Sequence, residues 1–178
     1  MIPIVTVFGS SVPEENSKDY TLAYDCGRKL AEAGMTVCNG GYRGTMEASA
    51  RGAKSAGGLT IGITISDWIR KPNPWIQQEI KTTSLIERLM KLVEMGNAYV
   101  VLPGGSGTLL EFACVLELIN KSVISPKPIV LIGDFWDGII ETLKHEPLAD
   151  GKDNCTRLIH KVGNPDELAI YLKKTLLP

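Results

Sequence analysis

Three short stretches of the chain combine glycine with hydroxyl residues, and each follows an apolar run. They are Gly9-Ser10-Ser11, Gly40-Gly41-Tyr42-Arg43-Gly44 and Gly104-Gly105-Ser106-Gly107-Thr108. Glycine lets backbone amides approach a ligand closely, and a following helix N-terminus adds partial positive charge. A tight strand-to-helix turn would explain any one stretch on its own. Three of them at one edge favour a phosphate cradle, so we predict that their glycine, serine and threonine residues bind phosphate and ribose.

Glu111 is a candidate for chemistry beyond phosphate binding. It lies three residues after Thr108, so on a helix the two side chains share a face and Glu111 points into the pocket beside the phosphate. A carboxylate near a helix N-terminus also stabilises the helix dipole, which is the alternative explanation. The dipole does not explain why this carboxylate stands among Leu109, Leu110 and Phe112.

Arg88 is the second charged candidate. Ser84 and Glu87 have the spacing of a capping box, which places Arg88 in the first turn of a helix, where a cation opposes the dipole. At the ligand edge Arg88 could pair bidentately with a phosphate or a carboxylate. A surface arginine paired with Glu87 or Glu94 fits the spacing equally well, so both interpretations stay open.

The hydrophobic pattern indicates the strands and helices that must position these residues. Strands are expected at 2–8, 35–38, 59–65, around 80–83, 98–103, 128–132 and 157–162. Helices are expected up to Gly34, up to Gly57, from Ser84 to near Gly96, from Thr108 to about Asn120, and over 135–144 and 165–176. The first half is a βαβαβ pattern, which requires parallel strands with helices as crossovers.

This alternation predicts an α/β fold with a single doubly wound, mostly parallel sheet of Rossmann-like type and helices on both faces. Residues 1–178 are expected to form one nucleotide-binding domain, because the length suits one good core. Ligands of such sheets bind beyond the carboxyl ends of the strands, where the crossover direction switches. The three glycine-rich stretches are all expected at that edge.

Several other kinds of site are disfavoured. A dinucleotide fingerprint is absent, because Asn39 stands where the first glycine of GxGxxG belongs. A Walker lysine is missing after Gly107. The two histidines, His145 and His160, are too few and too isolated for zinc, so neither a metal nor a cofactor is expected. The net charge of −1 gives no general attraction to nucleic acid or to anionic membranes.

Cysteine use and the N-terminus indicate a cytoplasmic protein. The four cysteines lack CxxC spacing and lie in apolar or mixed segments, as buried free thiols of a reducing compartment do. The N-terminal apolar run has no basic region before it and is interpreted as a strand rather than a signal peptide. No apolar run approaches the length of a membrane-spanning helix.

Two linked motifs resemble a known family. Glu87-Arg88, followed after fourteen residues by Pro103-Gly-Gly-Ser-Gly-Thr-Leu-Leu-Glu111, is similar to the paired signature of the LOG-like family. These are nucleoside 5′-monophosphate phosphoribohydrolases, among them the cytokinin-activating enzymes. With the glycines at 40–44, the resemblance covers roughly residues 3–145. It implies a Rossmann-like dimer that hydrolyses the N-glycosidic bond of a nucleoside 5′-monophosphate, releasing the free base and ribose 5-phosphate.

The resemblance also implies roles for particular residues. Arg88 and Glu111 match the catalytic pair of the family, and the phosphate and ribose loop is matched by Gly104, Gly105, Gly107 and Thr108. Plant-type members usually carry a lysine and a second acid where this chain has Leu89 and Leu110. The resemblance therefore does not extend to cytokinin specificity. No lysine has a setting that suits pyridoxal phosphate, so the decarboxylase label often given to this family finds no support.

The alternative function is a non-catalytic carrier of a nucleotide or of the molybdenum cofactor. Such a carrier would need the glycine loops but not both Arg88 and Glu111, so their joint presence favours the enzyme. A carboxylate can stabilise the positive charge that develops on ribose as the glycosidic bond breaks. Trp68 and Trp75 could stack on the base, although core or lid packing is expected for at least one of them.

The helix that begins at Thr108 predicts an oligomer. It is apolar nearly all round, whereas a helix that covers one face of a sheet needs only an apolar stripe. The second apolar face should meet a partner, so we expect a homodimer or a higher homo-oligomer.

Overall fold

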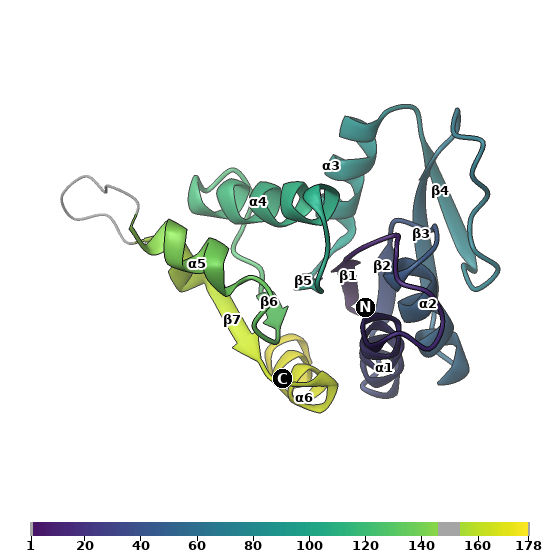
Figure 1. Cartoon of the computed structure of the whole chain (residues 1–178), viewed down its shortest axis with the longest axis horizontal. Helices are drawn as coiled ribbons and strands as arrows, with labels where there is room; N and C mark the ends of the chain where they lie inside the picture. The colour runs from purple at the N-terminus through teal and green to yellow at the C-terminus, as the bar shows by residue number, and fades with distance from the viewer. Residues whose placement is uncertain (1, 146–153, 178) are drawn as a thin grey trace.

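The computed structural model of the chain describes residues 2–145 and 154–177 and contains one parallel sheet (Figure 1). Its seven strands lie in the order β4-β3-β2-β1-β5-β6-β7. Their bounds are β1 Ile4–Phe8, β2 Thr36–Asn39, β3 Thr60–Ile65, β4 Gln78–Thr82, β5 Ala98–Val101, β6 Ile129–Ile132 and β7 Ile159–Val162. Every neighbouring pair is parallel, which confirms the predicted α/β class.

Helices connect the strands and cover both faces of the sheet. They are α1 Lys18–Glu32, α2 Thr45–Ser55, α3 Leu85–Met95, α4 Ser106–Asn120, α5 Asp137–Lys144 and α6 Pro165–Leu176, with a short 3-10 helix η1 at Cys155–Leu158. The chain builds outward from β1 to β4 and then returns to β5 on the other side of β1. The crossover direction therefore switches between β1 and β5, which is where a doubly wound sheet opens a crevice.

Some predicted boundaries shift by a turn or less. The helix expected from Thr108 begins at Ser106, because Gly105 is already its N-cap. The helix expected from residue 135 begins at Asp137, because Trp136 is its N-cap and the Asp137 amide donates to the Asp134 carbonyl at 3.1 Å in the turn before it. The last strand begins at Ile159 rather than at residue 157, because η1 occupies the preceding residues.

The capping box before α3 is present with one change. The Ser84 hydroxyl accepts a hydrogen bond from the Glu87 amide at 3.1 Å, as expected of an N-cap. The Glu87 carboxylate, however, accepts from the Thr83 amide at 2.7 Å rather than from that of Ser84. Together the two bonds fix where α3 begins and hence where Arg88 lies.

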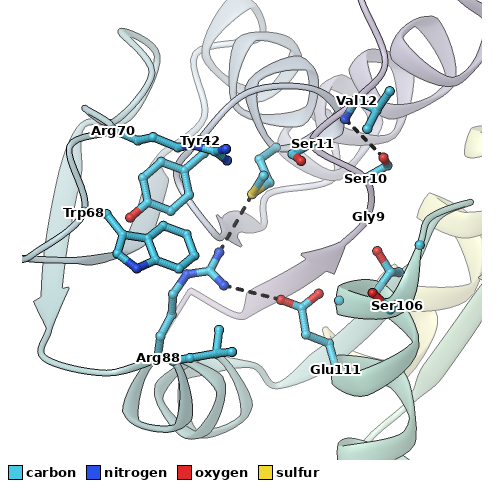
Figure 2. A pocket seen from close by; sticks show the side chains of 15 residues that line it. Gly9, Ser10, Ser11, Val12, Tyr42, Trp68, Arg70, Arg88, Ser106 and Glu111 are labelled. Atoms are coloured by element: carbon cyan, nitrogen blue, oxygen red, sulfur yellow. Dashed lines mark hydrogen bonds and ion pairs between the residues drawn. The ribbon is translucent and has the colours of Figure 1, made fainter.

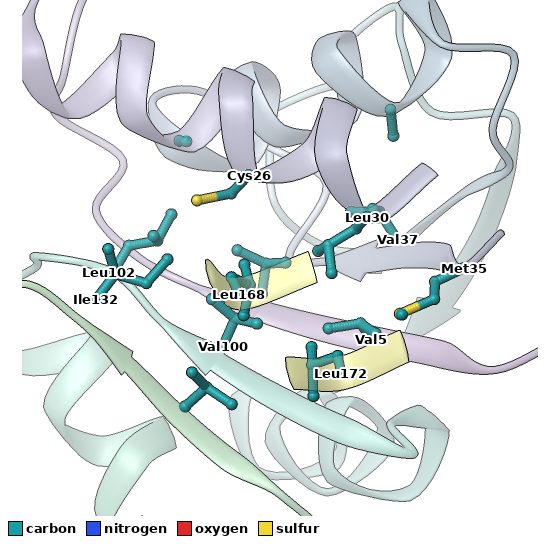
Figure 3. Packing of buried hydrophobic residues seen from close by; sticks show 14 of the residues in the cluster. Val5, Cys26, Leu30, Met35, Val37, Val100, Leu102, Ile132, Leu168 and Leu172 are labelled. Atoms are coloured by element: carbon teal, nitrogen blue, oxygen red, sulfur yellow. The ribbon is translucent and has the colours of Figure 1, made fainter. Parts of the chain in front are cut away.

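Strand alternation divides the core between the two faces. Val5 and Val7 of β1 point to the face covered by α1, α2 and α6, whose buried cluster is shown in Figure 3. Phe8 points to the opposite face, where it stacks on Tyr99 at 5.8 Å and packs with α3 and α4. Thr6 lies on this second face too, and its hydroxyl donates to the Leu92 carbonyl of α3 at 3.1 Å.

The pair α1–α2 is packed backbone against backbone. A Cβ added at Gly27 would collide with the Ser49 carbonyl, and one added at Gly52 would collide with the Tyr24 carbonyl. No side chain fits between the two helices at these two glycines, and beside them the Tyr24 hydroxyl donates a hydrogen bond to the Ser55 hydroxyl at 2.9 Å. The interface is closed within one chain.

The pair α3–α4 leaves apolar side chains exposed. Leu85, Ile86 and Met90 of α3 are 47%, 64% and 43% exposed, and Leu110 of α4 is 44% exposed. The all-round apolar character of α4 therefore reflects one buried side and one side that is open in the single chain. A partner for this surface stays a prediction.

The cysteines and the helices agree with the remaining expectations from the sequence. None of the four cysteines, all within the described residues, forms a disulfide; Cys26, Cys38 and Cys155 are buried and Cys114 is half-buried. None of the helices in the described part of the chain is both long and apolar enough to cross a bilayer.

Candidate active site

A pocket of about 320 Å³ opens at the carboxyl ends of β1 and β5 (Figure 2). The loop after β1 forms one wall with Gly9, Ser10, Ser11 and Val12, and the first turn of α4 forms the opposite wall. The remaining lining residues are Tyr42, Met46, Trp68, Arg70, Leu85, Arg88 and Glu111. The pocket therefore lies at the switch point that the topology defines.

The first turn of α4 faces this pocket with its backbone amides. Gly105 is the N-cap, and no side chain within the described residues caps the helix. The first amides of a helix lack intrahelical partners and carry partial positive charge, so this turn suits an anion. Gly105, Ser106, Gly107 and Thr108 all line the pocket, as predicted for a phosphate loop.

Gly104 has a different position from its neighbours. It is outside the pocket lining, and a Cβ there would collide with the Thr108 side chain. Thr108 is buried and occupies the space that Gly104 leaves open. Gly104 thus serves the packing of Thr108 within the loop, and direct ligand contact by Gly104 remains a prediction.

The loop after β1 is docked on the start of α2. The Ser10 carbonyl accepts hydrogen bonds from the Thr45 amide at 2.9 Å and from the Thr45 hydroxyl at 3.0 Å. A Cβ at Gly9 would collide with the same hydroxyl. The Ser10 hydroxyl accepts from the Val12 amide at 3.1 Å, which folds the loop over the pocket. Gly9, Ser10 and Ser11 therefore line the pocket on a loop that α2 holds in place.

The glycines of the second predicted loop lie behind the pocket wall. Gly40, Gly41 and Gly44 are absent from the described lining, whereas Tyr42 from the same loop contributes its ring. The Gly40 carbonyl accepts a hydrogen bond from Arg88 at 3.1 Å. Gly44 adopts a φ of 70° and packs closely on the backbone of the loop after β1. The loop thus positions other groups of the site, and direct phosphate contact by its glycines remains a prediction.

Arg88 is held rigidly beneath the pocket. Its side chain is only 9% exposed, its Nε donates to the Ile63 carbonyl at 2.8 Å, and its Nη2 donates to the Gly40 carbonyl. The remaining nitrogen, Nη1, lies 3.7 Å from Oε1 of Glu111. The alternative of a surface arginine is wrong, because Glu87 binds Thr83 and Glu94 pairs with Lys91.

Glu111 reaches the same point from α4. Its side chain is 14% exposed and meets Arg88 at the floor of the pocket. Burial raises the pKa of the Glu111 carboxyl to about 7, while the Arg88 guanidinium acts in the opposite direction. Glu111 lies beyond the first turn of α4, where the field of the helix dipole fades, so the dipole does not account for it.

The aromatic residues near the pocket separate into two groups. Trp68 lines the pocket and stacks on Tyr42 with ring centroids 5.4 Å apart. Trp75 lies outside the described lining, with the Arg51 guanidinium 5.4 Å from its ring. Tyr42 was missed by the sequence analysis, although it lies inside a glycine loop that was singled out. Its hydroxyl accepts from the Ile65 amide at 2.9 Å, which leaves the ring face towards Trp68 and Arg88.

Known proteins resemble this chain in sequence and in structure. An uncharacterized protein of Archaeoglobus fulgidus is 37% identical over 131 residues, which span 72% of this chain and 82% of that protein. A cytokinin riboside 5′-monophosphate phosphoribohydrolase of Rhodococcoides fascians is 29% identical over 147 residues, which span 79% of this chain and 74% of that enzyme. The molybdenum cofactor binding protein of Rippkaea orientalis has a similar structure, with a TM-score of 0.78 and 26% identity over 100% of this chain and 99% of that one.

The match to a family model assigns the chain to a family. The model described as the SLOG cluster4 family matches residues 2–168, which include every segment that lines the pocket. This match and the similarity to a phosphoribohydrolase confirm the resemblance that the motifs around Arg88 and Glu111 indicated. The chain belongs to the SLOG cluster4 family.

Proposed function

We propose that this protein hydrolyses the N-glycosidic bond of a nucleoside 5′-monophosphate and releases the free base and ribose 5-phosphate. The observation that carries the proposal is the buried Arg88–Glu111 pair at the floor of a pocket whose wall is a helix N-terminus. The similarity to a phosphoribohydrolase supports the same chemistry.

The positions of the groups suggest how the substrate lies. The 5′-phosphate binds the amides of residues 105–108 and the loop after β1, where partial positive charge is available. Glu111 lies three residues beyond Thr108, a rise of about 5 Å along the helix, and so reaches the ribose next to that phosphate. The base then extends towards Tyr42 and Trp68, whose rings provide a stacking surface.

The reaction needs a group that tolerates positive charge on the sugar. As the bond from C1′ to the base nitrogen breaks, its electron pair leaves with the base and the ribose becomes cationic. The Glu111 carboxylate stabilises that charge and accepts a proton from the water whose hydroxyl adds to C1′. A proton passes to the departing base. The hydroxyl of the water thus ends on ribose 5-phosphate and one proton ends on the free base. Arg88 favours the carboxylate form of Glu111 and keeps it in place.

A carrier of a nucleotide or of the molybdenum cofactor is the second candidate, and the structural similarity to the Rippkaea orientalis protein favours it. A carrier needs only the cradle. A carboxylate at the pocket floor would repel an anionic ligand and gain nothing for retention. The presence of Glu111 beside Arg88 supports the hydrolase over the carrier.

The experiment incubates the protein with a panel of nucleoside 5′-monophosphates and with the matching nucleosides, and measures free base by chromatography. We expect base release from monophosphates and a rate at least about tenfold lower for nucleosides, because binding energy at the phosphate orients the ribose. Equal turnover of adenosine and its monophosphate would contradict the proposal that the glycine-rich loops bind the 5′-phosphate. Tight retention of a nucleotide without base release would identify a carrier.

We further propose that the protein acts as a homodimer or a higher homo-oligomer in the cytoplasm. The exposed apolar residues of α3 and α4 support association, because they would be covered by a second copy. The absence of a disulfide among the four described cysteines suits a reducing compartment.

A further inference from the structure

A second cavity of about 530 Å³ adjoins the pocket and shares Tyr42 with its wall. This cavity, the basic annex, is lined by Ser11, Val12, Tyr42, Arg43, Arg70 and Lys71. Four of these residues also line the pocket that contains Arg88 and Glu111, so the two spaces lie side by side. The annex is the larger of the two, which leaves room for a ligand that extends beyond the catalytic pair.

The annex carries uncompensated positive charge. Its lining holds three cations, Arg43, Arg70 and Lys71, and no acidic residue. Within residues 2–145 and 154–177, no carboxylate lies within 4 Å of any of these three charged groups. One neighbouring hollow is lined by Arg43 together with three glutamates, Glu14, Glu15 and Glu47. Glu15 is already paired with Arg51.

A further acid, Asp67, lines another hollow together with Arg70. The chain as a whole has a net charge of −1, so a general excess of basic residues does not explain three unpaired cations in one cavity. A cavity lined by one sign of charge concentrates ions of the opposite sign.

The segment that bears Arg70 and Lys71 is anchored at both ends. Before them, Trp68 stacks on Tyr42. After them, the buried Asn73 side chain donates to the Gly41 carbonyl at 3.0 Å and to the Tyr42 carbonyl at 2.8 Å. Figure 2 shows Arg70 reaching over Tyr42 at the edge of the pocket. The cations are therefore positioned over the annex by contacts on either side.

The location of the annex indicates which part of a substrate would reach it. With the 5′-phosphate at the first turn of α4 and the ribose at Glu111, the base points to Tyr42, and the annex lies beyond that ring. We propose that the basic annex binds an anionic substituent carried by the base, so that the substrate is a nucleoside 5′-monophosphate with a second anionic group on its base. This inference rests on the proposed function for the orientation of the nucleotide.

The test compares the affinities of three ligands by calorimetry: AMP, its N6-(1,2-dicarboxyethyl) derivative, and adenosine 3′,5′-bisphosphate. We expect the dicarboxyethyl derivative to bind about tenfold more tightly than AMP, since several exposed ion pairs each contribute modestly. The preference should shrink as salt is raised, because the cations are exposed. Equal binding of AMP and the derivative would overturn the proposal, as would a preference for the bisphosphate, which carries its second anion on the ribose.

Charge-neutralising variants assign the preference to the annex. The double variant Arg43→Gln with Lys71→Gln should reduce the affinity ratio of the derivative to AMP to about threefold or less, because two of three cations are gone. The matched control is Lys173→Gln with Lys174→Gln, an exposed pair on α6, which should keep the wild-type ratio. An unchanged ratio in the first variant would overturn the assignment.

The outcomes separate this inference from the proposed function. Base release from AMP without tighter binding of the derivative would support the proposed hydrolase activity and overturn the proposal that the basic annex binds an anionic group on the base. A preference for the derivative without base release from any nucleotide would support the annex and contradict the hydrolase.

Discussion

The helix pairs α1–α2 and α3–α4 cover opposite faces of the same sheet and differ in what they leave exposed. Throughout α1 and α2, both fully described, no large apolar side chain is exposed, and the two helices meet backbone to backbone at Gly27 and Gly52. On α3 and α4, by contrast, four large apolar residues are exposed, at positions 85, 86, 90 and 110. The same two helices carry Arg88 and Glu111.

This difference indicates a division of labour. The close backbone approach at Gly27 and Gly52 permits little change in how α1 and α2 pack, so this pair holds in place the loop after β1 that docks on α2. The α3–α4 pair places a charged pair at the pocket floor and leaves apolar surface beside it. We infer that the first pair serves folding, whereas the second serves chemistry and association.

The largest effect is expected from closing the space between α1 and α2. Gly52→Val puts a side chain against the Tyr24 carbonyl, which is backbone and cannot move aside cheaply. The free energy of unfolding should fall by about 3 kcal/mol, measured by chemical denaturation. Gly138→Val on α5, where a Cβ meets open space, is the matched control and should stay within about 0.5 kcal/mol of wild type. Equal losses of unfolding free energy at both glycines would contradict the claim that the close α1–α2 contact stabilises the fold.

A smaller effect is expected from Glu111→Gln, which should change how the free energy of unfolding depends on pH. Its folded-state pKa of about 7 lies above the ordinary value of 4.5, so the folded protein binds more protons than the unfolded chain between those values. Stability contributed by the neutral carboxyl is therefore lost as pH rises through about 7. Relative to wild type, Glu111→Gln should gain about 1–3 kcal/mol of unfolding free energy between pH 5 and pH 8.

Thermal or chemical unfolding at the two pH values provides the measurement. Glu117→Gln, an exposed glutamate of the same helix, is the control and should follow the wild-type profile. Parallel profiles for Glu111→Gln and wild type would show that the site does not destabilise the Glu111 carboxylate.

The smallest effect on folding, and the clearest on association, is expected at the exposed residues of α3. The double variant Ile86→Lys with Met90→Lys should change the unfolding free energy of the single chain by no more than about 0.5 kcal/mol, because both positions are exposed. It should nevertheless convert the proposed dimer to a 19.3 kDa monomer in light scattering, since lysines would enter an apolar interface.

Ile170→Lys is the matched control for that experiment. Ile170 is 69% exposed on α6, on the opposite face of the sheet, so its replacement should leave the dimer intact. A monomeric wild type at micromolar concentration, or dissociation by the control alone, would contradict the assignment of the interface.

Sequence patterns predicted the strands and helices well, because local signals mark them. Gly34, Ser84 and Gly96 each mark a helix end that the structure contains, and the β-branched runs became the central strands. The boundaries that moved, at Asp137 and Ile159, follow a turn and a short 3-10 helix that the hydrophobic pattern does not mark.

The site was less predictable than the fold. Linked motifs pointed to Arg88 and Glu111, but whether their side chains meet depends on how the successive helices α3 and α4 are oriented on the sheet. Tyr42 was missed because a glycine loop can present either its amides or its side chains to a pocket, and in this loop the Tyr42 ring lines the pocket while the Gly40 carbonyl accepts from Arg88. The position of Arg70 at the pocket was missed, since it lies in an irregular segment whose placement depends on the long-range contacts of Asn73 and Trp68.

The proposed role of Glu111 is tested most directly by the rate of base release in Glu111→Gln. The substitution keeps the size of the side chain and removes its charge, so hydrolysis of a nucleoside 5′-monophosphate should fall by at least ~10²-fold. That loss corresponds to roughly 2.7 kcal/mol of transition-state stabilisation. Nucleotide affinity should change much less, and Glu117→Gln should retain wild-type rates. Wild-type hydrolysis that persists unchanged in correctly folded Glu111→Gln would contradict the catalytic assignment.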